Sequence, residues 1–131
     1  MSEDHHPIRL HHVNIVTENM PAGVTRCSHD HRYLWVSPSL AAWLGRASTE
    51  FVGLPILDLI GREAYDTILP HITRVLSGER EEYEAQINYL GQGPRWIHAV
   101  YVPTRDQDDK IDGWIAVVTD ITKRHEIEER R

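Results

Sequence analysis

The chain of 131 residues is poor in several features that would assign it to a special class. It has a single cysteine, Cys27, which excludes an internal disulfide framework and favours a reducing cytosol. Its longest apolar runs, such as Trp114–Val118, are too short to span a membrane. Its first residues, MSEDHHPIRLHH, lack the basic and then apolar pattern of a signal peptide. We therefore expect a cytoplasmic domain that makes no membrane contact.

A surplus of positive charge is also missing. The chain has 14 lysines and arginines, which are scattered, against 20 aspartates and glutamates, and its net charge is −6. This balance disfavours binding to nucleic acid or to an anionic membrane surface, because both need clustered positive charge. The hydrophobic share of 40% and the charged share of 26% are ordinary for a globular domain, so we expect one folded core.

Residue periodicity divides the first third of the chain into a helix and a hairpin. Residues 1–7 are polar and rich in histidine, which indicates a disordered leader. Apolar residues at helical spacing across 8–20 predict an N-terminal cap helix, which Pro21 ends. Two short extended runs, 23–28 and 32–37, follow around a polar turn and predict a β-hairpin.

The middle of the chain has a helical pattern. Pro38 suits the first turn of a helix. Residues 49–53 and 58–60 are typical of short helical turns. Residues 63–76 have apolar side chains at every third or fourth position, which predicts the longest helix. Pro70 lies inside this stretch, so we expect a local kink there.

Three strands, 82–90, 94–104 and 114–122, complete an α+β domain built on an antiparallel sheet. The first strand alternates polar and apolar residues. The other two are apolar on both faces, and such strands must be covered on both sides. We expect the helices to cover one face of the sheet and the N-terminal cap helix, a partner subunit, or both, to cover the other. The residues assigned to this second face are Trp96, Val100, Ile115 and Val117.

Three blocks of sequence follow one another in a specific order and spacing. They are ENMPAGVTRCSHDHRYLWVSPSLAAWLG, STEFVGLPILDLIG and PRWIHAVYVPTRDQDDKIDGWIAVVTDIT, the last of which ends in the motif Asp120-Ile121-Thr122. Across residues 12–125 the chain resembles the PAS sensory domains. The resemblance implies a PAS fold, with a five-stranded antiparallel sheet and helices on one face. It also implies a domain over residues 21–122 and the start of a C-terminal signalling helix at 123–131.

The same resemblance implies a function. PAS domains sense a ligand, a redox state or light and pass the change to an attached output domain. We therefore expect a non-catalytic, homodimeric sensory module of a bacterial signalling protein, a histidine kinase in the first place, with the output domain outside this chain. The alternatives are a ligand-free dimerisation or protein-interaction module, and the sensor of a cyclic-di-nucleotide enzyme or of a transcription regulator.

A pocket between the sheet and the helices would hold the ligand if the geometry of the family applies here. Small residues such as Ala99 and Ala116 leave space between aromatic walls in one interpretation, whereas Tyr101 and Trp114 fill that space in the other. The sequence leaves both interpretations open. The residues that the resemblance assigns to the pocket are Trp43, Tyr65, Leu69, Ile72, Ile87, Ala99, Tyr101, Trp114, Ala116 and Val118.

The end of the last strand is the expected signal junction. In the family the aspartate and threonine of this motif brace the strand against the following helix, which assigns that role to Asp120 and Thr122. Both are also good helix-start residues, since their side-chain oxygens accept free N–H groups. The nine residues that follow carry one apolar side chain, Ile127, which is too few to hold a helix alone in water.

Other chemistry is not expected. Ser28-His29-Asp30 spells a catalytic triad, but neighbouring side chains of an extended segment point to opposite faces. His29 and His31 supply only half of a tetrahedral metal site. The position that matches the haem histidine of some PAS domains is Thr67, with His71 one turn later, and the cysteine motif of the flavin-binding branch is missing. We therefore expect no metal, haem or flavin, and at most an unknown small organic ligand.

Overall fold

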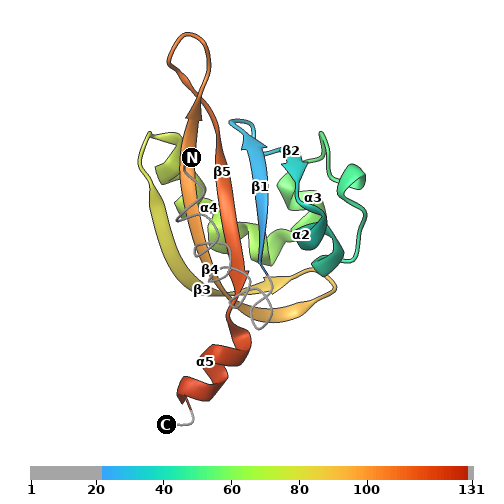
Figure 1. The fold of residues 1–131 in the computed structure, drawn as a ribbon. Coiled ribbons are helices and arrows are strands. Elements are labelled where there is room, and N and C mark those ends of the chain that lie inside the picture. Colours follow the sequence, from blue (N-terminus) through green and yellow to red (C-terminus); the bar gives the residue numbers. More distant parts are fainter. Residues whose placement is uncertain (1–21, 130–131) are drawn as a thin grey trace, which may run out of the picture.

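The computed structural model describes residues 22–129, which form one sheet and several helices (Figure 1). The predicted leader at 1–7 and cap helix at 8–20 lie outside the described residues. In chain order the elements are β1 (Ala22–Ser28), β2 (Tyr33–Val36), α2 (Pro38–Trp43), η1 (Ser48–Glu50), α3 (Ile56–Ile60), α4 (Arg62–Leu76), β3 (Glu81–Tyr89), β4 (Gly93–Arg105), β5 (Ile111–Asp120) and α5 (Thr122–Glu129). The strand order is β2-β1-β5-β4-β3, with antiparallel neighbours throughout. The predicted α+β class and five-stranded antiparallel sheet are confirmed.

The core lies between the sheet and the helices that cover one of its faces (Figure 1). On β4 the fully buried Ile97 and Ala99 alternate with residues that are only partly buried, as a strand with one face on the core requires. From the helical layer, α4 contributes Ile68 and Ile72, which are four positions apart on one side of the helix. The apolar stripe predicted for the longest helix is therefore the side that packs on the sheet.

Helix α2 lies close against β1, and this contact fixes one wall of the core. The hydroxyl oxygen of Ser37 caps α2 by accepting from the N–H of Leu40 and also accepts from the N–H of Val24 on β1 at 3.0 Å. A Cβ atom at Gly23 would lie 2.3 Å from the Cβ of Leu40, so glycine alone permits this approach. The end of α2, with Trp43, is thereby held over the sheet.

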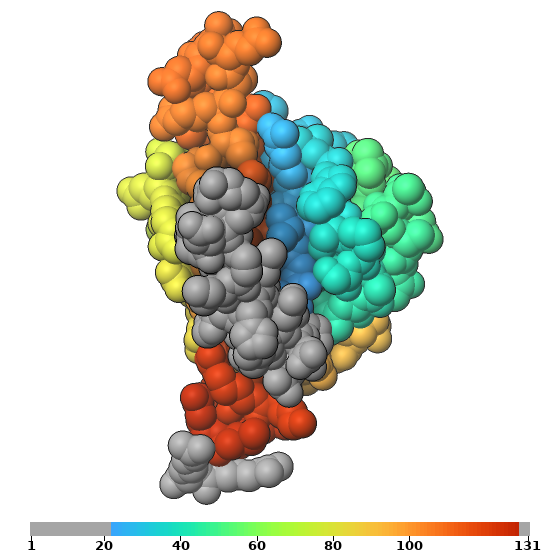
Figure 2. Space-filling model, in the orientation of Figure 1, coloured from blue at the N-terminus to red at the C-terminus, as the bar shows by residue number. Residues whose placement is uncertain are grey.

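The last strand ends earlier than the sequence predicts. The predicted strand runs to Thr122, whereas β5 ends at Asp120 and Thr122 already begins α5. Helix α5 and the turn between β4 and β5 project from opposite ends of the domain (Figure 2). The strand that crosses the middle of the sheet therefore leads directly into a helix that leaves the domain.

Candidate functional site

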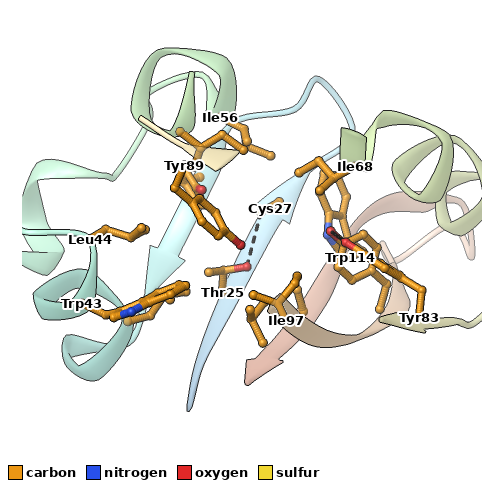
Figure 3. A pocket seen from close by; sticks show the side chains of 16 residues that line it. Thr25, Cys27, Trp43, Leu44, Ile56, Ile68, Tyr83, Tyr89, Ile97 and Trp114 are labelled. Atoms are coloured by element: carbon orange, nitrogen blue, oxygen red, sulfur yellow. Dashed lines mark hydrogen bonds between the residues drawn. The ribbon is translucent and has the colours of Figure 1, made fainter. Parts of the chain in front are cut away.

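A cavity of about 50 Å³ lies in the core between the sheet and the helices (Figure 3). Half of the ten residues assigned to a pocket from the sequence line it. They are Trp43, Tyr101, Trp114, Ala116 and Val118. Three of these residues, Trp114, Ala116 and Val118, occupy alternate positions of β5, so one strand forms a continuous part of the wall. Whether these residues bind a ligand stays a prediction.

The other five assigned residues lie outside the lining. Ile72, Ile87 and Ala99 are fully buried and pack in the core away from the cavity. Tyr65 and Leu69 are half-buried on α4. Leu69 lies outside the lining because of the helical period of α4. With 3.6 residues per turn, Ile68 points toward the cavity and Leu69 points about 100° away from it. The hydroxyl of Tyr65 instead hydrogen-bonds with Nδ1 of His31 at 2.6 Å.

Sequence reasoning assigned no pocket residue to the first two strands, although both contribute to the lining. Thr25 and Cys27 on β1 and Tyr33 on β2 line the cavity, as does Tyr89 at the end of β3. The spacing of two between Thr25 and Cys27 places both on the core side of β1 and was the available signal. The remaining lining residues are Leu40, Leu44, Ile56, Ile60, Ile68, Tyr83 and Ile97.

The cavity walls are neutral and carry few polar groups. Burial raises the pKa of the Cys27 thiol to about 12, against a smaller opposing effect of its contact with Thr25. Burial likewise raises the pKa of Tyr83 to about 12. The hydroxyls of Tyr83 and Tyr101 lie 2.7 Å apart and hydrogen-bond with each other. These groups stay protonated at neutral pH, so the cavity offers thiol and hydroxyl dipoles and aromatic faces but no charge.

The end of β5 is fastened to β4 by a buried carboxylate. Asp120 is 4% exposed, and its Oδ1 accepts from the N–H of Thr122 at 2.9 Å. Its Oδ2 accepts from Nε of Arg95 on β4, also at 2.9 Å. A buried carboxylate needs such donors, because leaving it without partners would cost several kcal/mol. Asp120 therefore links the end of β5 both to β4 and to the start of α5.

Thr122 has a different geometry from the helix cap that its residue type suggested. Its hydroxyl oxygen accepts from the backbone N–H of Trp96 at 2.8 Å, while the N–H of Ile121 donates to the carbonyl oxygen of Trp96 at the same distance. These bonds continue the β4–β5 ladder past the last strand residue. The first residue of α5 is thus held by β4 rather than by its own helix.

Helix α5 also contacts the sheet through side chains. The ring of His125 stacks on Trp96, with centroids 3.7 Å apart and planes 10° apart. A guanidinium N–H of Arg124 donates to Glu84 on β3 at 2.8 Å. Trp96, which the sequence assigned to the face covered by the cap helix or a partner, therefore packs against α5 of its own chain. This contact was not predicted from the sequence, because a histidine on one element that meets a tryptophan on another leaves no periodic pattern in the sequence.

The other residues assigned to the outer face remain partly exposed. Val100 is half-buried, whereas Ile115 is 37% exposed and Val117 is 42% exposed. Trp35 and Val102 are exposed as well. This face of the sheet is thus apolar and incompletely covered in the described part of the chain.

The histidine-containing motifs take structural positions. The Ser28 hydroxyl donates to the carboxylate of Asp30 within the β1–β2 turn. His29 is exposed while His31 turns inward, so they do not face a common ion, and residues 22–128 contain no cluster suited to a metal. His71 hydrogen-bonds with Glu81 and does not line the cavity. No helix among the described residues is long and apolar enough to cross a membrane.

Comparison with known proteins agrees with this architecture. The family model described as the PAS fold matches residues 17–126. Among curated proteins, none matches the chain. A domain of an HTR-like protein from Haloarcula marismortui is 28% identical, and the match covers 78% of this chain and 99% of that chain with a TM-score of 0.64.

Two further solved structures share the fold at lower identity. A domain assigned to a light and redox sensing histidine kinase from Haloarcula marismortui is 18% identical over 86% of this chain and 99% of that chain, with a TM-score of 0.65. VqmA of Vibrio cholera, solved with a ligand and DNA, is 13% identical over 86% of this chain and 50% of that chain, with a TM-score of 0.62. The match to the family model spans most of the sequence, and the chain belongs to the PAS family of sensory domains.

Proposed function

We propose that this PAS domain senses a small molecule in its core cavity and relays occupancy through β5 and α5 to an output domain. The observation that carries the proposal is the position of β5. Trp114, Ala116 and Val118 form part of the cavity wall, and the same strand ends at the Asp120 carboxylate that holds Arg95 and the first N–H of α5. A shift of the strand at the cavity therefore acts directly on the junction.

In this proposal the domain has two states that differ in the position of β5. A ligand changes their populations only if it binds one state more tightly than the other. The small volume of the cavity, about 50 Å³, supports such a difference in affinity. An entering molecule larger than that must displace its walls, and β5 is one of them. The energy for moving the strand thus comes from contacts that the ligand makes only in the shifted state.

The output domain in this proposal is a histidine kinase domain. The support is the likeness to the domain assigned to a light and redox sensing histidine kinase. VqmA is a relative whose structure contains a ligand and DNA, which makes a transcription regulator the alternative output. The partly exposed Ile115 and Val117 suit a homodimer, because such a face gains free energy when it is covered. Light scattering across a concentration series tests the dimer.

One observation favours a second function, a ligand-free dimerisation module. An engineered cavity that takes benzene measures about 150 Å³. The cavity here has a third of that volume, and ordinary domain cores contain a few voids larger than a water molecule. In this alternative the aromatic walls are simply core.

Native mass spectrometry of the freshly purified protein separates the two functions. The proposal predicts a retained small molecule that is lost in Ala116→Val, because the added methyl groups enter the cavity. Ala99→Val is the matched control, since Ala99 is equally buried on the neighbouring strand but does not line the cavity. A protein that carries no small molecule from any expression host, and binds none, would support the dimerisation module instead.

A further inference from the structure

Two tyrosines line the cavity with hydroxyl oxygens that are not fully enclosed by protein atoms. Tyr33 is 5% exposed and Tyr89 is 8% exposed, and both line the cavity. Within the described part of the chain, neither hydroxyl makes a hydrogen bond, whereas those of Tyr83 and Tyr101 satisfy each other. Because both residues line the cavity and their hydroxyls are not bonded to other side chains, these hydroxyls can donate to a molecule that enters it.

The rings of the two unpaired tyrosines are held in place by neighbouring aromatic residues. Tyr33 packs edge-on against Phe51 with centroids 5.3 Å apart, and Tyr89 packs edge-on against Trp43 at 5.2 Å. Such contacts hold the two rings, and with them the positions of the hydroxyl oxygens. Each O–H bond can still rotate about its C–O bond to meet an acceptor.

The cavity is chemically uneven from side to side. In Figure 3, Tyr89 lies on the side of Trp43 and Leu44, whereas Trp114 and Tyr83 lie across the pocket. Because the Tyr83 hydroxyl is already paired, this far side presents mainly aromatic surface. A molecule that satisfies both sides has one polar end and one apolar end.

Neither the cavity wall nor its ligand is expected to carry a charge. None of the side chains that line the cavity is acidic, basic or a histidine. Burial raises the pKa of Tyr33 well above its ordinary value, and burial does the same for Tyr89, so both hydroxyls remain protonated donors. An ion that entered would lose its hydration shell and meet no counter-charge.

The size of the cavity sets the last limit. Its volume of about 50 Å³ is below the roughly 150 Å³ that accommodates benzene. Admitting even one ring therefore requires the walls to move, β5 among them. This requirement limits the ligand to about the size of a single ring.

We infer that the cavity takes an uncharged molecule no larger than a single ring, with one oxygen or nitrogen that accepts a hydrogen bond from the Tyr89 or Tyr33 hydroxyl. Its apolar end lies against Trp114. This inference rests on the proposed function, since it names the chemical class of the ligand at the same site.

The test compares phenol, toluene and benzoate as probes, with binding followed by the NMR signal of the Trp43 indole N–H. The three share a ring and differ in one substituent, which is polar, apolar or charged. Phenol should bind most tightly, toluene roughly three- to tenfold more weakly because it lacks the hydrogen bond, and benzoate not measurably. In Tyr89→Phe or Tyr33→Phe the preference for phenol over toluene should disappear, while toluene affinity stays unchanged.

Tyr65→Phe is the matched control, because it removes a hydroxyl that bonds to His31 outside the cavity lining. It should keep the preference for phenol. Benzoate binding as tightly as phenol, or a preference that survives in both cavity variants, would overturn the chemical class but leave the cavity as a ligand site. If no probe moves the Trp43 signal and the purified protein retains no molecule, the proposed function falls as well.

Discussion

The backbone N–H of Trp96 donates to the hydroxyl oxygen of Thr122 across 2.8 Å, so the first residue of α5 is hydrogen-bonded to β4. Asp120, two residues earlier, bonds to Arg95, the neighbour of Trp96. The junction is thus fixed at two adjacent positions of one strand. A helix with so few apolar residues gains its order from this attachment rather than from its own propensity.

Thr122→Val tests the attachment, because valine keeps the shape of threonine and removes the hydroxyl. We expect a loss of about 1–2 kcal/mol in the free energy of unfolding, since the partly buried N–H of Trp96 loses its acceptor. Urea denaturation measures it. Thr73→Val, on the exposed side of α4, is the control and should change the free energy by less than about 0.5 kcal/mol. Equal effects of the two substitutions would show that the hydrogen bond between Thr122 and Trp96 does not stabilise the domain.

The stability of the domain should fall as the pH drops below the ordinary pKa of histidine, in part through His31. Burial lowers the pKa of His31 from its ordinary 6.5, against an opposing effect of Asp30. The unfolded chain therefore takes up the proton first as the pH falls, and stability is complete above pH 6.5 and decreases below it.

The variant His31→Asn should flatten that slope between the ordinary and the lowered pKa. Asparagine suits the position because the backbone there has a φ of 65°, which asparagine tolerates. The control is His29→Asn at the exposed position of the same turn. Thermal unfolding followed at a series of pH values measures both, and an unchanged slope in His31→Asn would show that burial of this ring has no energetic effect.

Cys27 should resist thiol reagents in the folded protein. Because burial raises its pKa from 9.0 to about 12, the thiolate fraction at pH 8 is lower by roughly a thousandfold, before the shielding of the sulfur by the core is counted. Labelling with a coloured disulfide reagent should be slow in buffer and complete within minutes in concentrated urea. Equal rates in the two conditions would mean that β1 does not bury this side chain.

The sequence predicted the elements whose periodicity is strong. The alternation of Tyr83, Ile87 and their neighbours identified the core side of β3, and the stripe that includes Ile72 identified the packed side of α4. Both are local patterns with periods near two and 3.6 residues. Such patterns show which side of a helix or strand faces the core, and the structure confirms those sides for α4 and β3.

The cavity and the junction needed information that no local pattern carries. The buried side of α4 includes several residues, and only the final packing decides that Ile68 meets the void while Ile72 does not. The pairing of Thr122 with Trp96 joins positions 26 residues apart, and it replaced the helix cap that the residue type favours. Long-range contacts of this kind override local preference wherever the chain folds back on itself.

The central claim is that occupancy of the cavity is transmitted to α5. The direct measurement is an NMR titration of the protein with phenol that follows the Trp43 indole N–H, beside the cavity, and the backbone N–H of Trp96, at the junction. We predict that both signals shift with one dissociation constant and that Ala116→Val abolishes both shifts. A Trp43 signal that saturates while the Trp96 signal stays fixed would contradict the account, because the ligand would then bind without reaching the junction.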